Sequence, residues 1–383
     1  MRLDLDPVRV RALRARIGMP LERAAELSRL SEDRIRGLEE HGGSVEVDEA
    51  QRLAKAYNRN WYVFLLEKEP GRPALPHDFR RLGHGFELSA DSLIAFDDAE
   101  ALVDKILDLP RHEERPPVVL PALSGLDAEA AAARVRDALH VTLEAQRAAG
   151  EAYRAIRFWT EALTRAGLYV AQLSFPYDEV RAFCLRRDPV AVIVVSSRDS
   201  PPARVFSMLH ELGHILRGGS GMCQPEPASR PGMAQEEVFC NAFAAALLMP
   251  AEAFASDPEA QRLRGRRVEL GDAIALARRW GVSELAALRR LTTVGLLSAE
   301  DYERLHEQRA REFGEKLADE PRPDPTARRI RHEFKRMINE SSRLYAVEVL
   351  DAQARGDISL REVGVLLGGN LKHLPKLRQE LQK

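Results

Sequence analysis

The stretch SMLHELGHIL, residues 207–216, carries the strongest chemical signal in this chain. It places His210, Glu211 and His214 among apolar residues, in a protein of 383 residues that has only 10 histidines. On an α-helix, residues i and i+4 lie one turn apart on the same face, so the two imidazoles can reach one point. This is the arrangement that a tetrahedral zinc ion needs, and the pattern therefore predicts a metal site on a helix.

Glu211 follows the first histidine by one position and is turned away from it by about 100°. It can therefore reach a water on the metal without binding the metal itself. Zinc lowers the pKa of such a water towards ~7, and the carboxylate can take its proton as the hydroxide attacks a peptide carbonyl. Because the same carboxyl can then protonate the leaving amine, the pattern predicts peptide hydrolysis without a covalent intermediate.

The alternative is that this pattern arises by chance on an amphipathic helix. Met208, Leu209, Leu212 and Ile215 make the helix mostly apolar, so the histidines would be partly buried. Burying two imidazoles and a carboxylate without partners is costly. Metal binding removes that cost, which favours the metal site over the chance pattern.

A catalytic zinc site uses three protein ligands and a water, so a third ligand is required. The segment EEVFCNAFAAALLMP, residues 236–250, predicts a second helix whose small residues allow close packing. A carboxylate in its first turn could meet the histidines, but helical phase does not separate Glu236 from Glu237. Either one could instead be a solvated glutamate favoured by the helix dipole. The downstream candidates for the third ligand are Glu226, Glu236, Glu237, His306 and His332.

Composition limits the partners and the compartment. Lys+Arg 57 and Asp+Glu 59 nearly cancel, so any nucleic-acid contact must come from a local patch. No apolar run reaches the roughly 20 residues of a membrane span, and MRLDLDPVRVR lacks the apolar core of a signal peptide. The cysteines Cys184, Cys223 and Cys240 are too few and too scattered for a disulfide framework. We therefore expect a cytoplasmic protein that has no membrane partner.

The pattern along the chain predicts an α+β fold. The N-terminal part reads as short helices with tight turns, which is the plan of an all-α helix-turn-helix bundle. Three short runs, LYVAQLSF, VRAFCLRRD and VAVIVVSS, read as strands of a small sheet that precedes the HExxH helix. The expected divisions are a helix-turn-helix domain at 1–72, a helical linker region at 73–126, a peptidase domain at 127–310 and a helical C-terminal region at 325–383.

Several of these segments together resemble the ImmA/IrrE family of metallopeptidases. The HELGH sequence is preceded by a strand and by Arg204 and Phe206, and a helix of the form E-x-x-x-N-x-F-A-x-x-L-L-M-P follows it. Cys240 departs from the family, because alanine is usual at that position, and SML replaces the usual small residues before HELGH. The matching residues in the second helix are Glu237, Asn241, Phe243, Ala244, Leu247, Leu248, Met249 and Pro250.

The resemblance implies a zincin-like fold and narrow proteolysis. It implies that Glu237 is the third ligand of zinc and that the substrate is an XRE-type repressor of stress or mobile-element genes. The sequence leaves open whether manganese takes the place of zinc. The N-terminal helices, followed by Asp78, Phe79 and Arg80, resemble an XRE-type helix-turn-helix joined to such a peptidase. The partners to expect are then the repressor, operator DNA and a second copy of the chain in a homodimer.

The presumed recognition helix SEDRIRGLEE gives a mixed signal for DNA binding. Ser31 is its expected N-cap, and Arg34 and Arg36 are the cations that could reach DNA. Glu32 and Asp33 stand near the end that usually faces the groove and weaken this interpretation. Two functions therefore stay open: a zinc endopeptidase whose N-terminal module finds a repressor or its operator, and a DNA-binding regulator whose peptidase-like half is mainly a sensor.

Overall fold

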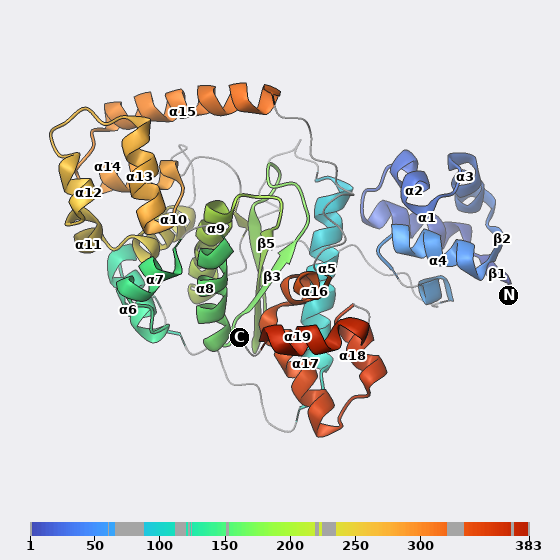
Figure 1. The fold of residues 1–383 in the computed structure, drawn as a ribbon. Coiled ribbons are helices and arrows are strands. Elements are labelled where there is room, and N and C mark those ends of the chain that lie inside the picture. The colour runs from blue at the N-terminus through green and yellow to red at the C-terminus, as the bar shows by residue number, and fades with distance from the viewer. Residues whose placement is uncertain are drawn as a thin grey trace.

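The computed structural model describes residues 2–59, 61–65, 88–111, 120–121, 123, 125–150, 153–218, 222–223, 235–319, 333–368 and 371–381. Within these ranges the protein is rich in helices and contains two small sheets, which agrees with the predicted α+β class (Figure 1). None of the described helices is long and apolar enough to cross a membrane. The segment Asp78, Phe79 and Arg80 lies outside the described residues.

The N-terminal module, residues 2–65, is built around a hydrophobic core that Ala90, Leu93 and Ile94 also join. Ser31 accepts a hydrogen bond from the Arg34 backbone N–H at 3.2 Å and caps α3, as the sequence predicts. Ile35 and Leu38 on the same helix are buried against Val10, Leu13 and their neighbours. The helices of the module are α1 (Pro7–Arg16), α2 (Leu21–Ser28), α3 (Glu32–His41), α4 (Val47–Ala56) and the 3-10 helix η1 (Trp61–Leu65).

This module is not all-α, which corrects the prediction. Strand β1 (Arg2–Leu5) pairs antiparallel with β2 (Gly43–Glu46), and Leu3 lies opposite Val45. Each strand has only four residues, and 37 residues of helix and turn separate them in the chain (6–42). Such short, distant strands leave no recognisable hydrophobic alternation in the sequence. For this reason the sequence predicted only a turn at HGGS, where β2 begins.

A four-stranded sheet forms the centre of the rest of the chain (Figure 1). Its strands are β3 (Tyr169–Leu173), β4 (Ala182–Arg187), β5 (Val190–Ser196) and β6 (Met222–Cys223), in the order β3-β5-β4-β6. Strands β3 and β5 are parallel, and β4 is antiparallel to both of its neighbours. Every residue of β5 is buried, because helices cover both faces of the sheet.

The helices on the first face carry the HExxH motif. Alternate sheet residues such as Cys184, Ile193 and Val195 share a core with α8, α9 and α10. Helices that follow α10 extend this core, and Gly281, with φ 67°, forms the turn between α13 and α14. The bounds are α6 (Ala128–Ala138), α7 (Leu143–Ala149), α8 (Tyr153–Arg165), α9 (Pro201–Leu216), α10 (Gln235–Leu248), α11 (Ala251–Ala255), α12 (Pro258–Arg262), α13 (Leu270–Trp280), α14 (Glu284–Thr293) and α15 (Ala299–Asp319).

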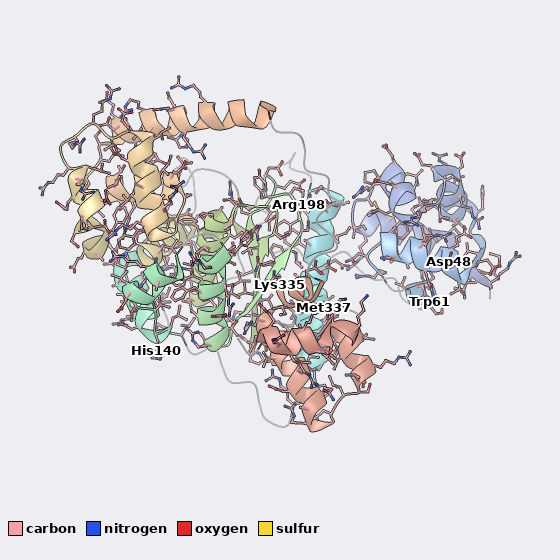
Figure 2. The ribbon with its side chains drawn as sticks, viewed as in Figure 1. Asp48, Trp61, His140, Arg198, Lys335 and Met337 are labelled. Carbon is pink, nitrogen blue, oxygen red and sulfur yellow. The ribbon has the colours of Figure 1, made fainter. Side chains whose placement is uncertain are left out.

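The opposite face of the sheet is covered by segments that lie far apart in sequence. Phe183, Val192 and Val194 share a second core with α5 and with the C-terminal helices, including Met337 and Tyr345. Figure 2 labels Met337 on α16, close to the sheet. The C-terminal helices therefore complete the sheet's core. These elements are α5 (Ala90–Asp108), α16 (Glu333–Ser341), α17 (Arg343–Arg355), α18 (Leu360–Leu366), η3 (Leu371–His373) and α19 (Leu374–Leu381).

The N-terminal module docks on α5 through a buried carboxylate. Asp97 of α5 is 2% exposed and forms ion pairs with Arg16 and Arg59 of the module. Asn58 donates a hydrogen bond to Asp98 at 2.8 Å. Buried ion pairs and a hydrogen bond thus connect the module to the helix that supports the sheet.

Candidate metal centre

Helix α9 is fixed to the sheet at its N-terminal end. Pro201 and Pro202 occupy its first turn, where their missing N–H groups leave no hydrogen bond unmade. The Arg204 guanidinium donates to the Asp199 carbonyl at 2.8 Å and to Gln172 Oε1 of β3 at 3.2 Å. Two turns further along the helix, His210 and His214 therefore stand on a support that the sheet holds in place.

Helix α10 approaches α9 closely because Gly213 has no side chain. A Cβ atom at Gly213 would lie 3.0 Å from Cys240 Sγ and 3.3 Å from Phe243 Cδ1. Such contacts are tighter than packing allows, so the glycine inside HELGH sets the spacing of the two helices. The sequence reading gave Gly213 no role, although a glycine inside an apolar helix is the usual signal for close approach.

The two histidines and Glu237 come together between these helices. His210 Nε2 lies 3.2 Å from Glu237 Oε2, and His214 Nε2 lies 3.0 Å from Glu237 Oε1. The two Nε2 atoms are 3.1 Å apart. Each of the three residues offers one ligand atom, and these atoms all lie within 4.8 Å of one another. Among the described residues this is the only group of three or more potential ligands that meets this distance.

These distances fit a divalent metal ion. Ligand atoms placed 2.0–2.1 Å from zinc in a tetrahedron are separated by about 3.3 Å, close to the separations found here. His214 Nδ1 is buried without a hydrogen-bond partner among the described residues, and Glu236 Oε1 lies 3.6 Å from it. Two imidazoles and a carboxylate are also the donor set of many catalytic zinc sites. The residues present therefore suit such an ion.

The structure distinguishes Glu237 from Glu236 as the candidate third ligand, which helical phase alone does not do. Glu237 faces both Nε2 atoms, whereas Glu236 lies on the Nδ1 side of His214 and is about half exposed. His306 lies on α15 and stacks on Tyr302. Two other candidates for the third ligand, Glu226 and His332, lie outside the described residues.

Asn241 orients the first histidine. Its Oδ1 lies 3.0 Å from His210 Nδ1. A carbonyl oxygen accepts a hydrogen bond, so Nδ1 carries the hydrogen and Nε2 is left with its lone pair towards Glu237. The sequence reading gave Asn241 no role. Its position four residues after Glu237, on the same face of α10, is the signal that could have revealed it.

Glu211 is completely buried beside this group. Its residue exposure is 0%, and neither carboxyl oxygen has a hydrogen-bond partner of ordinary geometry among the described residues. The Cys184 thiol of β4, a weak donor, is a polar neighbour. Burial raises the pKa of the Glu211 carboxyl, although the charges of His214 and His210 act in the opposite direction.

The two carboxylates at this centre have opposite electrostatic properties. Burial also disfavours the charge of Glu237, but the adjacent imidazoles of His210 and His214 outweigh it and lower the pKa of this carboxyl. At His214 burial opposes protonation, yet the adjacent Cys240 thiol and Glu237 carboxylate raise the pKa of the imidazole. Glu237 therefore stays anionic, as a metal ligand must, while Glu211 is shifted towards holding a proton.

The far end of α10 is held by buried polar side chains. Arg136 donates to the Leu247 carbonyl at 2.6 Å, and Gln146 donates to the Leu248 carbonyl at 2.8 Å. Arg290 donates to the Met249 carbonyl at 2.7 Å. These bonds satisfy carbonyls that a helix C-terminus leaves open, and the two cations suit its negative dipole end. They fix the helix that presents Glu237.

The DNA-binding candidates lie far from this centre, on the N-terminal module. Arg34 pairs with Glu49 at 2.7 Å, and Arg36 pairs with Asp33 at 2.7 Å. Ser31 is engaged as the cap of α3. Both arginines thus already balance carboxylates of their own module.

Comparison with known proteins bears on the part of the chain that holds the candidate metal centre. Residues 163–292 match the Peptidase_M78 family model, described as the IrrE N-terminal-like domain. The match runs from the end of α8 through the sheet, α9 and α10 into α14, and it does not reach the N-terminal module. No curated protein matches the chain. The part that holds His210, His214 and Glu237 is therefore similar to a metallopeptidase domain.

Proposed function

We propose that the protein is a zinc-dependent endopeptidase in which His210, His214 and Glu237 bind the metal and Glu211 carries the proton. The observation that carries this proposal is the convergence of the three ligand residues beside a fully buried carboxyl. The match of residues 163–292 to a peptidase family supports it. Manganese is the alternative metal, although imidazole ligands suit zinc well.

When bound, zinc supplies an electrophile that acidifies water and polarises a peptide carbonyl. His210 and His214 would hold it through their Nε2 atoms, and Asn241 would keep His210 in the required tautomer. The ionised Glu237 contributes one negative charge, so the ligand set only partly neutralises a divalent cation.

The Glu211 carboxyl moves the proton during the reaction. Burial raises its pKa above the ordinary carboxyl value, and this direction suits a group that must accept a proton and then donate it. The carboxylate accepts a proton from the attacking water, and the carboxyl donates it to the amine of the departing peptide. In this scheme no side chain forms a covalent bond to the substrate.

The proposed substrate is an XRE-type repressor, and its cleavage would release stress or mobile-element genes. This part of the proposal rests on the resemblance of the motif segments to the ImmA/IrrE family. The N-terminal module would then help to find the repressor or its operator. Because Arg34 and Arg36 are paired within the module, recognition of the repressor protein is the better supported of these two roles.

The test is a Glu211→Gln variant incubated with a purified XRE-type repressor that the wild-type protein cleaves. We expect cleavage to slow by about 10²–10⁴-fold, the usual contribution of a general acid–base group, while bound zinc stays stoichiometric. Glu252→Gln, an exposed change on α11, is the matched control and should cleave at the wild-type rate. Full cleavage by Glu211→Gln with zinc bound would reject the peptidase proposal.

The alternative function, a DNA-binding regulator with a sensor half, predicts a different result. In that case an Arg34→Gln, Arg36→Gln double variant would bind operator DNA more weakly and with a shallower salt dependence. Under our proposal these two changes leave repressor cleavage at the wild-type rate. Fluorescence anisotropy with duplex DNA over a salt series, run beside the cleavage assay, separates the two functions.

A further inference from the structure

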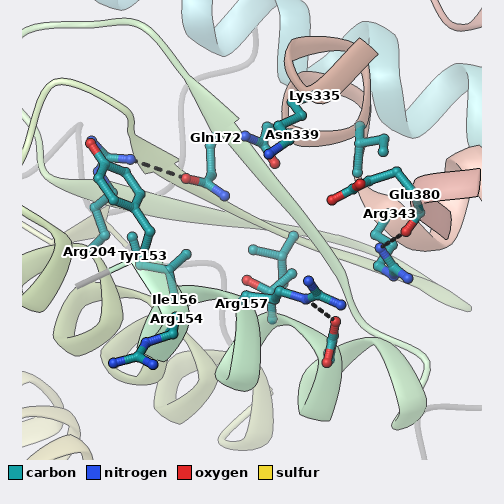
Figure 3. Close-up of a pocket in the computed structure, with 14 residues that line it drawn as sticks. Tyr153, Arg154, Ile156, Arg157, Gln172, Arg204, Lys335, Asn339, Arg343 and Glu380 are labelled. Carbon is teal, nitrogen blue, oxygen red and sulfur yellow. Dashed lines mark hydrogen bonds and ion pairs between the residues drawn. The ribbon is translucent and has the colours of Figure 1, made fainter. Parts of the chain in front are cut away.

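A cavity lies apart from the metal centre, where the C-terminal helices meet α8 and the sheet. It is bounded by α8, by the outer edge of β3 and by α16 and α19 (Figure 3). Its volume is about 430 Å³, within the range of small-molecule sites. None of the residues proposed for the metal centre lines it.

Positive charge is concentrated in this cavity. Five cationic side chains line it against only two carboxylates, those of Glu161 and Glu380, whereas the whole chain has a net charge of −2. Arg154, Arg157 and Lys335 are exposed and Arg204 is buried, and such a local excess of one sign of charge attracts anions. The cations are Arg154, Arg157, Arg204, Lys335 and Arg343.

Only part of this charge is balanced by the protein. Arg157 pairs with Glu161 at 2.7 Å. Arg343 donates to the Leu381 carbonyl at 2.8 Å, and a carbonyl oxygen does not neutralise its charge. Lys335 and Arg154 have no hydrogen-bond or ion-pair partner among the residues that the structure describes. The cavity therefore retains positive charge that a ligand could balance.

The uncharged polar groups add hydrogen-bond donors. The Oε1 atom of Gln172 accepts a hydrogen bond from Arg204 at 3.2 Å, which leaves the Gln172 amide NH₂ available. Figure 3 shows Gln172, Lys335 and Asn339 around the same space, with Tyr153 at the rim. Tyr153 is 64% exposed, and the Arg204 guanidinium lies over its ring, 5.9 Å from the centroid.

We propose that this cavity binds a small anionic ligand through a phosphate or carboxylate group, with Lys335 as the principal charged contact. The ligand would bridge α8 and β3 to α16 and α19, and so hold the C-terminal helices on the sheet. Arg204 joins the cavity to the helix that carries His210 and His214, because it belongs to α9 and contacts Gln172. Binding here does not depend on the peptidase proposal.

The test is isothermal titration of the full-length protein with inorganic phosphate and with succinate, at constant ionic strength. These two probes distinguish a phosphate site from a carboxylate site. We expect saturable binding of at least one of them, weakened about tenfold in Lys335→Gln because one charged contact is lost. Gln172→Glu keeps the acceptor for Arg204 but places a negative charge in the cavity, and it should abolish binding.

Lys376→Gln is the matched control, because this exposed lysine of α19 does not line the cavity. It should bind the probes with wild-type affinity. Equal losses in Lys335→Gln and Lys376→Gln would mean non-specific attraction to surface charge and would reject the proposal. Failure of both probes to bind the wild-type protein would also reject it. Neither readout uses peptidase activity, so the two proposals can fail separately.

Discussion

The metal centre and the N-terminal module use charged side chains in opposite ways. At the centre, Glu211 is completely buried and its carboxyl oxygens have no hydrogen-bond partner of ordinary geometry among the described residues. In the module, Arg34 and Arg36 balance carboxylates within a few ångströms. Burial without a partner is costly, and a protein keeps such a group where a ligand or a reaction uses it. This difference favours α9 and α10 as the place of the proposed chemistry.

The largest expected effect comes from removing the anionic ligand at the centre. Glu237→Gln keeps the size of the side chain but loses the charge that faces both Nε2 atoms. We expect zinc affinity to fall by roughly 10³-fold, because a neutral amide is a poor zinc ligand. Zinc retained after dialysis against a competing chelator measures the loss. Glu236→Gln, one residue away, should change the affinity little, and equal losses in both variants would leave Glu237 without a special role.

The second-largest effect is expected on the free energy of unfolding, at the ion pairs between the module and α5. Asp97→Asn leaves the guanidinium groups of Arg16 and Arg59 without their buried counter-charge. Removing one partner of a buried ion pair costs about 3 kcal/mol, and we expect a loss of that size in urea unfolding. Asp104→Asn removes an exposed partner of Arg187 and should cost far less. Comparable losses would show that the Asp97 contact does not hold the module.

The sequence predicted the centre better than it predicted the overall packing. His210, Glu211 and His214 follow from the spacing of one helix, and the three main strands follow from short runs rich in valine and isoleucine. The choice between Glu236 and Glu237 depends on how α10 rotates against α9, which helical phase cannot determine. The β1–β2 pairing and the covering of the sheet by α5 and the C-terminal helices are contacts between distant segments, and local patterns do not encode them.

A smaller effect tests the orientation of His210. Asn241→Ala removes the acceptor at His210 Nδ1, and loss of such a partner typically weakens metal binding by about 10–100-fold. Asn241→Asp restores an acceptor of the same length and should recover most of the affinity. A merely structural role for Asn241 would lower thermal stability without changing zinc affinity, so both are measured on the same samples.

The smallest effect comes from an exposed ion pair of the module. Arg2 donates to Glu46 at 2.9 Å and joins β1 to β2, and this hydrogen bond lowers the pKa of the Glu46 carboxyl. A lowered folded pKa contributes stability above the ordinary carboxyl value of about 4.3, and the contribution is lost as the pH falls through the folded pKa. Glu46→Gln should therefore lower the melting temperature slightly at neutral pH and hardly at all in acid. Because both side chains are more than half exposed, added salt should also remove the difference, and a difference that survives high salt would contradict this account.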